Sequence, residues 1–277
     1  MHKTAIRFVL ACLLSPAREA ASATHHVPAR VGLVLIAAAQ DGLALAADGS
    51  SINADGRISQ EQKLFQLGKQ GALALTGAVS IQDPVGGRVR GEINVARIAA
   101  AWLAAHGDAE LETANREVNA AIAAELNKFL AARDPGAAAG MFKFGVIAAG
   151  YSAGKPSLII TSYFMPGTKG KPARAEQSSA APAPGDLWIF GSSAAPAEIL
   201  SGKNVAFNTF REEPGAAKFH SAQKASLTAH DYVGLFQAML QAAQSAQGKK
   251  LDNKRAIVAA PNQFATLTPT AGYISMQ

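Results

Sequence analysis

Apolar segments separated by Asp-Gly pairs dominate the chain between residues 31 and 77. Residues 31–39 and 43–47 are rich in Val, Leu, Ile and Ala, and Asp41-Gly42 lies between them. Glycine accepts the positive φ angles of a tight turn, so this arrangement predicts a β-hairpin. About half of the whole chain, 49%, is apolar, which suffices for a large buried core.

A second hairpin follows, with strands at residues 64–67 and 72–76. Two such hairpins in succession indicate an antiparallel sheet buried on at least one face. Asp48 directly follows the second apolar segment and Lys63 directly precedes the third. These two side chains either serve a reaction, or Asp48 caps its turn and Lys63 pairs with it for structure alone.

The remaining chain alternates between helical and strand periodicity. Apolar residues at helical spacing predict two helices, from Glu92 to Gly107 and from Leu111 to Asp134, after a loop at 78–91. Further strands are predicted at 142–149, 158–164, 187–190, 256–260 and 263–267, with helices at 196–200 and after a Thr228 cap. This order predicts an α+β fold in which helices cover antiparallel sheets.

One domain, residues 24–277, accounts for this pattern. Residues 166–185 are rich in Pro, Gly, Ala, Ser and Lys, which predicts a flexible insertion within the domain. No internal repeat is evident in the sequence.

The first 23 residues have the layout of a secretory signal peptide. Lys3 and Arg7 precede the apolar residues 8–14, and Ala21-Ser22-Ala23 forms a small-residue cleavage site. We therefore expect export to the periplasm or beyond, and a cytoplasmic protein if the segment is a disordered tail or a misassigned start. Cys12 is the only cysteine, so removal of the leader leaves no thiol for disulfides, catalysis or metal binding.

Charge and hydropathy disfavour several function classes. The net charge is +6, but the basic residues are scattered and not interleaved with aromatic residues, which disfavours nucleic-acid binding. No segment after the leader reaches the roughly 18 apolar residues of a membrane span. His25 and His26 could bind a metal only with distant partners, so we expect neither a metal nor a cofactor.

Gly150-Tyr-Ser152-Ala-Gly154 matches G-x-S-x-G, the nucleophile elbow of serine hydrolases. The elbow requires a helix directly after the serine, whereas Lys155-Pro156 and a β-rich run follow here. A hairpin is the better interpretation, and a serine hydrolase using Ser152 is kept as an alternative.

Several motifs, in order, resemble the proteasome-type subunits of the N-terminal-nucleophile (Ntn) hydrolases. They are the block Leu43 to Ser50 with Asp48, the segment Lys63 to Leu67, Ala74 to Ala78, Gly145 to Tyr151, and Trp188 to Ser192. The resemblance covers nearly the whole chain after Val31. It implies a four-layer αββα sandwich, which agrees with the order of elements.

The resemblance also implies roles for particular residues. In that family an N-terminal threonine, freed by propeptide removal, is the nucleophile, and its own α-amino group is the general base. The family's lysine falls on Lys63, and the aspartate that orients it falls on Asp48. The backbone N–H of Gly77 falls where the family stabilises the oxyanion, and Ser192 falls on an accessory serine.

The nucleophile position departs from the family pattern. Counting back from the conserved aspartate leads to Val31 or Gly32, and neither has a hydroxyl or thiol. Leader cleavage would expose Thr24 as a free N-terminal threonine, but it precedes that position by more than ~20 Å of extended chain. Asp252 matches a late family aspartate, but Arg255 stands where a serine should follow.

Two functions follow from these observations. The first is hydrolysis of peptide or amide bonds by Asp48, Lys63 and Gly77 around an unidentified nucleophile. The second is a noncatalytic structural or binding subunit. The resemblance further implies self-association into rings, and export argues against an ATPase partner.

Overall fold

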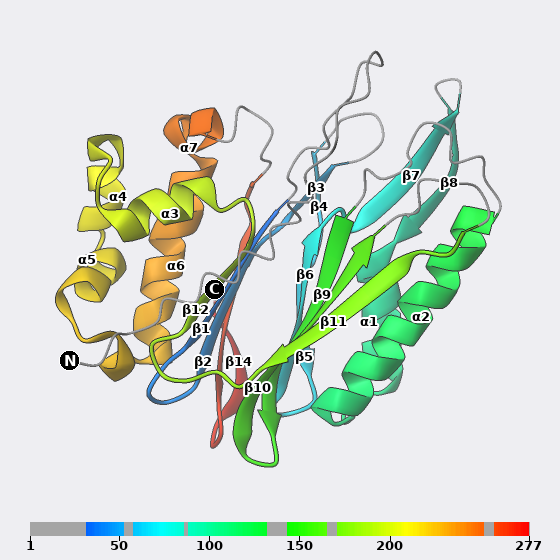
Figure 1. The fold of residues 1–277 in the computed structure, drawn as a ribbon, viewed down its shortest axis with the longest axis horizontal. Helices are drawn as coiled ribbons and strands as arrows, with labels where there is room; N and C mark the ends of the chain where they lie inside the picture. The colour runs from blue at the N-terminus through cyan, green and yellow to red at the C-terminus, as the bar shows by residue number, and fades with distance from the viewer. Residues whose placement is uncertain are drawn as a thin grey trace.

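The computed structural model of the protein describes residues 32–52, 58–85, 88–131, 143–164, 171–251 and 258–276. Two antiparallel sheets lie face to face, and helices cover the outer face of each (Figure 1). This is the predicted α+β, four-layer αββα sandwich. The predicted leader, Thr24, Val31 and Asp252 lie outside the described residues.

The first sheet contains the N-terminal hairpin. Its strands, in spatial order, are β12 (Leu187–Gly191), β1 (Leu33–Ala38), β2 (Leu43–Asp48), β13 (Asn262–Thr268) and β14 (Gly272–Met276). The hairpin predicted around Asp41-Gly42 is confirmed, with Ile36 opposite Leu45. Strand β14 was missed, and residues 258–260, within a predicted strand, form none.

The second sheet contains the second predicted hairpin. Its order is β11 (Arg174–Ala180), β10 (Lys155–Phe164), β9 (Lys143–Ser152), β6 (Gly71–Gly77) and β5 (Leu64–Leu67). Strand β11 lies inside the stretch predicted as a flexible insertion. It pairs with β10 along its whole length, so this part of residues 166–185 is an edge strand of the sheet, which the sequence did not reveal; the flexibility of the stretch stays a prediction.

Two small hairpins complete the strands, β3 (Ser50–Ile52) with β4 (Ile58–Gln60) and β7 (Ser80–Val85) with β8 (Arg88–Asn94). The second of them replaces the loop predicted at 78–91. Both hairpins lie at the upper end of the sandwich in Figure 1.

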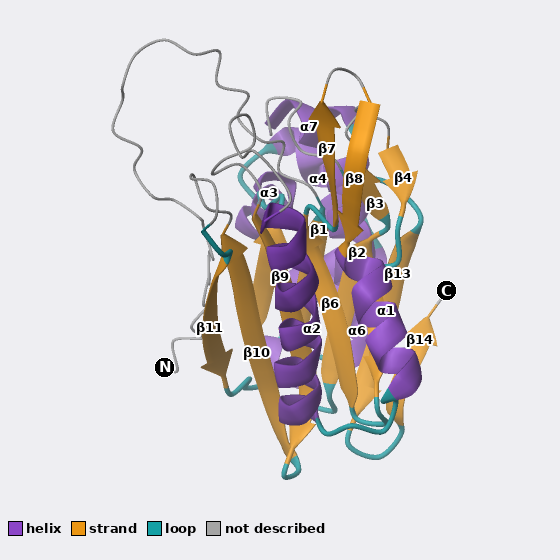
Figure 2. Ribbon diagram, turned by 90° about the vertical axis from the view of Figure 1, so that its right-hand side faces the viewer, coloured by secondary structure: helices purple, strands orange, loops and turns teal. Residues whose placement is uncertain are grey.

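Helices α1 (Val95–Ala105) and α2 (Leu111–Ala131) cover the second sheet, as Figure 2 shows. The first sheet is covered by α3 (Ala194–Ser201), α4 (Asn208–Glu212), α5 (Pro214–Ser221), α6 (Ala229–Gln244) and α7 (Ala246–Leu251). Thr228 caps α6 in a capping box with Asp231, as predicted. In the described part of the chain, no helix is both long enough and apolar enough to cross a membrane.

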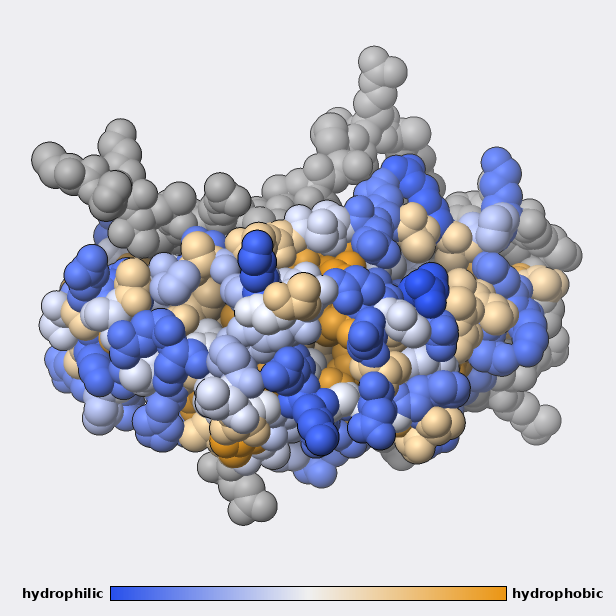
Figure 3. Space-filling model, turned by 90° about the horizontal axis from the view of Figure 1, so that it is seen from below, coloured by the Kyte–Doolittle hydropathy of each residue, from blue (hydrophilic) through white to orange (hydrophobic). Residues whose placement is uncertain are grey.

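The continuous apolar runs in the sequence follow from burial on both faces of each sheet. In β1, Val34 and Ile36 pack between the sheets, whereas Leu33 and Leu35 pack under the helices. An apolar core also fills the space between the second sheet and α1 and α2. The end seen from below is mostly hydrophilic, with small apolar patches near its middle (Figure 3).

Candidate functional site

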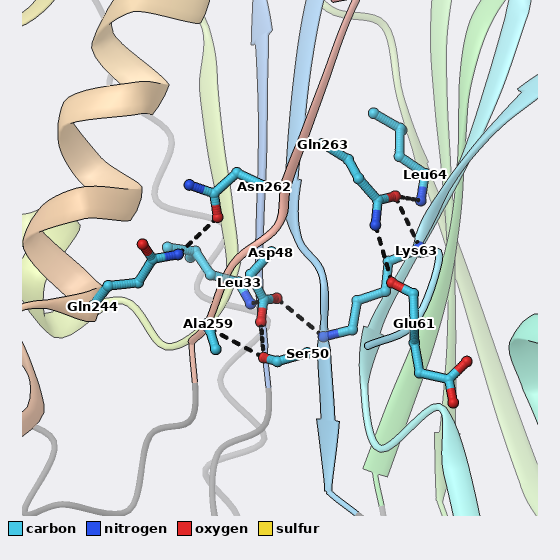
Figure 4. A network of polar contacts seen from close by, with 10 residues as sticks. All are labelled: Leu33, Asp48, Ser50, Glu61, Lys63, Leu64, Gln244, Ala259, Asn262 and Gln263. Carbon is cyan, nitrogen blue, oxygen red and sulfur yellow. Dashed lines mark hydrogen bonds and ion pairs between the residues drawn. The ribbon is translucent and has the colours of Figure 1, made fainter. Parts of the chain in front are cut away.

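Asp48 and Lys63, the two charged residues singled out in the sequence, form an ion pair. Asp48 ends β2 in the first sheet, and Lys63 directly precedes β5 in the second. Lys63 Nζ lies 3.0 Å from Asp48 Oδ1, and both side chains are fully buried (Figure 4). The pair therefore joins the two sheets at their interface.

The carboxylate of Asp48 is satisfied by several donors. The backbone N–H of Leu33 donates to Oδ1 at 2.7 Å, and the hydroxyl of Ser50 donates to Oδ2. Ser50 Oγ in turn accepts a hydrogen bond from the backbone N–H of Ala259 at 3.2 Å. Because a buried charge is stable only when it is paired and hydrogen-bonded, these donors keep Asp48 in place.

The backbone around Lys63 is held by Gln263, which lies on β13 of the opposite sheet (Figure 4). Gln263 Oε1 accepts from the N–H groups of Lys63 at 3.0 Å and of Leu64 at 2.9 Å. Its Nε2 donates to the carbonyl of Glu61 at 3.0 Å. Gln263 thus fixes the start of β5, and with it the position of the lysine.

Burial lowers the pKa of Lys63, because an ammonium group loses hydration inside the protein. The negative charges of Asp48 and Glu61 and the hydrogen bond to Asp48 oppose this effect, and burial is the largest of the causes. Lys63 therefore releases its proton at a lower pH than a lysine in water.

Gly32 lies directly against the ion pair. Its φ is +83°, and a Cβ built on it would lie 2.6 Å from Lys63 Nζ and 3.0 Å from Asp48 Oδ1. The lysine amine thus fills the space of a side chain at this position. Gly32 is one of the two residues that the family spacing places at the nucleophile, and it offers no hydroxyl.

Two residues at the junction of β12 and α3 contact the backbone carbonyl of Gly32. The backbone N–H of Ser192 donates to the carbonyl of Gly32 at 3.0 Å, and Ser192 is fully buried. At Gly191, where φ is +91°, any Cβ would collide with that same carbonyl oxygen. The structure therefore brings Ser192 next to the candidate site through its backbone.

Gly77 ends β6 with φ of +84°, directly after Thr76. Thr76 Oγ1 lies 3.2 Å from a Cβ built on Gly191, which places this end of β6 beside the glycines of the site. The oxyanion role of Gly77 and the accessory role of Ser192 stay predictions. Those for Thr24 and Asp252 concern residues outside the described part of the chain.

Ser152 does not lie on a nucleophile elbow. It ends β9, and β10 begins at Lys155, so the chain forms a hairpin through Ala153 and Gly154, both with positive φ. Ser152 lines a cavity of about 680 Å³ at the lower end of the sandwich. Ser152 lies roughly 20 Å along the strands from Lys63. The hairpin that was the better interpretation of the sequence is confirmed, and no helix directly follows the serine as an elbow requires.

Ser50 and Gln263 were not identified from the sequence as part of this site. Ser50 follows Asp48 by two residues, and this close spacing was an available signal. Gln263 is 200 residues from Lys63, and no local pattern announces their contact. Among the described residues, no group of three or more His, Cys, Asp or Glu side chains could hold a metal ion.

Taken alone, the arrangement offers a buried amine and a buried carboxylate but no adjacent hydroxyl or thiol on Gly32. A carboxylate-oriented lysine can assist a nucleophile, yet it needs one within hydrogen-bond reach. Gly32 supplies no such group, and the hydroxyl of Ser50 donates to Asp48.

No protein-family model matches the sequence, and neither does any curated protein. Solved structures do resemble the fold. The helical assembly of the Anbu complex from Pseudomonas aeruginosa gives a TM-score of 0.51 at 14% identity, over 88% of this chain and 86% of that one.

Two further structures give lower scores over similar lengths. Anbu (ancestral beta-subunit) from Yersinia bercovieri has a TM-score of 0.46 at 12% identity, over 88% of this chain and 87% of that one. The Anbu (Gly-1) mutant from Hyphomicrobium sp. strain MC1 has a TM-score of 0.46 at 11% identity, over 88% and 84%. The likeness to the Pseudomonas protein confirms the fold as that of proteasome-like Ntn-hydrolase subunits.

Proposed function

We propose that this chain is a noncatalytic, self-associating subunit built on the proteasome-like fold. The observation that carries the proposal is Gly32, which has no side chain at the point where the ion pair would serve a nucleophile. A fold of this kind does not by itself imply hydrolysis, because activity depends on the residues of the site.

A side chain at position 32 would require the amine of Lys63 to move from its present position. Any Cβ there would lie 2.6 Å from Lys63 Nζ, well inside the normal contact distance. The amine of Lys63 contacts Asp48, and both side chains are fully buried. The site is therefore arranged as a structural connection between the two sheets.

The similar fold from Pseudomonas aeruginosa supports self-association, since that protein was solved as a helical assembly of the Anbu complex. Self-association is also what the family resemblance implied. For this chain we accordingly propose a homo-oligomer, and the mass of the purified protein in solution tests it.

A second candidate is a peptide or amide hydrolase in which Thr24 is the nucleophile. It is favoured by the retention of both charged partners and by the lowered pKa of Lys63. Thr24 precedes Gly32 by eight residues, up to ~27 Å of extended chain. The segment between them would have to return Thr24 to the ion pair.

Three measurements on the purified protein separate the two candidates. N-terminal sequencing and intact mass identify the first residue of the mature chain. An electrophile directed at N-terminal threonines, with an active threonine hydrolase as positive control, tests for a nucleophile. A panel of peptide and amide substrates tests turnover, with Thr24→Ala as the matched variant.

We expect no labelling and no turnover above that of Thr24→Ala. Labelling that disappears in Thr24→Ala, accompanied by substrate turnover, would establish the hydrolase and refute the noncatalytic proposal. Export is proposed from the leader pattern alone, and fractionation of expressing cells together with the N-terminal sequence tests it.

A further inference from the structure

Strand β5 is a short edge strand, and Lys63 directly precedes it. The strand has four residues, and among the described strands only β6 pairs with it. The side chains of Glu61, Gln62 and Gln66 around it are exposed or half-buried, whereas that of Lys63 is fully buried. Short edge segments flanked by exposed residues open locally at a lower free-energy cost than the core of a domain. We therefore expect the segment around Lys63 to open more readily than the centre of the sheet.

The side chain of Gln263 holds this segment against the first sheet. Its Oε1 accepts from the N–H groups of Lys63 and Leu64, and its Nε2 donates to the carbonyl of Glu61. One amide side chain thus makes three of its four possible hydrogen bonds to backbone on both sides of the lysine. The N–H of Glu61 also donates to the carbonyl of Gly49 at 2.9 Å. Because β13 is paired with both β2 and β14, Gln263 is fixed to the first sheet.

Asp48 does not depend on the lysine alone for its hydrogen bonds. The backbone N–H of Leu33 and the hydroxyl of Ser50 also donate to its carboxylate. If Lys63 moves away, the buried carboxylate keeps these two donors. Their presence lowers the cost of separating the ion pair, because the greatest penalty falls on a buried charge without any partner.

We propose that Gln263 is a latch on the start of β5, and that its release exposes the amine of Lys63 while the two sheets stay folded. In the latched state, Nζ contacts Asp48 and is closed to solvent (Figure 4). When residues 61–64 move away from β13, the amine separates from Asp48 and reaches solvent. The connection between the sheets is thus reversible at this point. The latch goes beyond the proposed function, because it acts within a single chain and depends on neither self-association nor catalysis.

Acetylation of Lys63 in the full chain measures this opening. The probe is the N-hydroxysulfosuccinimide ester of acetic acid, which transfers its acetyl group to a neutral amine and releases N-hydroxysulfosuccinimide. Peptide mass spectrometry gives the rate at Lys63. Hydrogen exchange of the central amides of β2 and β9 gives the rate of global unfolding for comparison.

Two variants separate the latch from other contacts of β13. Gln263→Met removes the three hydrogen bonds and keeps a side chain of similar length. Gln244→Met is the matched control, because Gln244 on α6 donates to Asn262 Oδ1 at 2.7 Å, next to Gln263 on β13 but from the helix layer. We expect Lys63 to be acetylated at least about tenfold faster in Gln263→Met than in the wild type, since three hydrogen bonds are lost. Gln244→Met should leave the rate unchanged.

The wild type alone also tests the latch, so the test does not depend on the folding of a variant. Its Lys63 should react faster than global unfolding allows and with little dependence on low urea concentrations, because a local opening exposes little surface. Reaction of wild-type Lys63 only at the rate of global unfolding would refute the latch, and so would equal rates in Gln263→Met and Gln244→Met. Neither result bears on self-association, which the mass of the protein in solution tests.

Discussion

Replacing Gly32 by alanine tests whether the lysine amine occupies the space of a side chain at that position. Two costs add at this residue. A non-glycine residue at positive φ costs about 1–2 kcal/mol. Crowding in a packed interior typically costs a further ~1–3 kcal/mol, and here the added Cβ would lie 2.6 Å from Lys63 Nζ. Gly32→Ala should therefore lower the free energy of unfolding by about 2–5 kcal/mol.

Gly154→Ala separates the two costs. Gly154 also has positive φ, +75°, but a Cβ built on it has nothing within 4 Å. The free energy of unfolding of this variant should fall only by the cost of a non-glycine residue at positive φ, about 1–2 kcal/mol. The difference between the two variants then measures the collision with the ion pair, which we expect to be about 1–3 kcal/mol.

Urea denaturation followed by circular dichroism provides both values, if the slope of the unfolding curve is the same for all variants. Adding Lys63→Ala removes the amine, so Gly32→Ala should cost less in that background than in the wild type, although Asp48 Oδ1 still lies 3.0 Å from the added Cβ. Equal losses for Gly32→Ala and Gly154→Ala in the wild-type background would refute the contact between Gly32 and Lys63.

Three further predictions follow from the buried polar groups. Lys63→Met should lower the free energy of unfolding by about 3–5 kcal/mol, because Asp48 is left buried without its cation; a loss below about 1 kcal/mol in urea denaturation would contradict this. Between its lowered pKa and the ordinary 10.5, Lys63 binds fewer protons in the folded chain than in the unfolded one. The stability of the wild type relative to Lys63→Met should therefore rise with pH toward 10.5, by up to about 1.4 kcal/mol per pH unit. A difference that falls with pH in urea denaturation between pH 8 and pH 10 would contradict it. Thr161→Val should stabilise the protein by about 1 kcal/mol, because Thr161 Oγ1 is buried without a hydrogen-bond partner among the described residues. A higher midpoint of thermal unfolding would confirm this, and a lower midpoint would indicate that the hydroxyl has a hydrogen-bond partner.

The parts of the fold that were predicted from the sequence are those with strong local signals. The hairpins around Asp41-Gly42 and Gly68 to Gly71 combine apolar strands with turn residues, and both formed as expected. Helices α1 and α2 followed from apolar residues at helical spacing. These elements bury a large apolar surface, so periodicity alone was enough to reveal them.

Two of the strands that were missed, β11 and β7, carry few apolar residues or contain a turn-like pair. Strand β11 has the sequence Arg-Ala-Glu-Gln-Ser-Ser-Ala, and six of its residues in succession are exposed. Its sequence therefore lacks the alternation of apolar and polar residues that marks a half-buried strand. Asp83-Pro84 lies within β7, where the pairing with β8 is irregular between Gln82 and Pro84. Pairing with a neighbouring strand decides the structure of these segments, and such pairing is not visible in local composition.

The candidate site was predicted in its charged residues and missed in its supporting contacts. Asp48 and Lys63 stood out because charges are rare beside buried strands. The contact of Gln263 with Lys63 depends on the two sheets lying face to face, and the position of Gly32 against the amine depends on the path of the chain. Neither could be derived from spacing along the sequence.

The presence of Asp48 and Lys63 in the buried interface has a structural explanation that needs no reaction. Asp48 accepts from Leu33 on β1 and, through Ser50, is linked to Ala259, while Lys63 ties it to the second sheet. Removing either charge would leave the other buried and unpaired, which is strongly destabilising. A subunit that lost its nucleophile would therefore still need both residues to hold its sheets together. The ion pair alone is thus weak support for hydrolysis, and the residue at position 32 carries the functional argument.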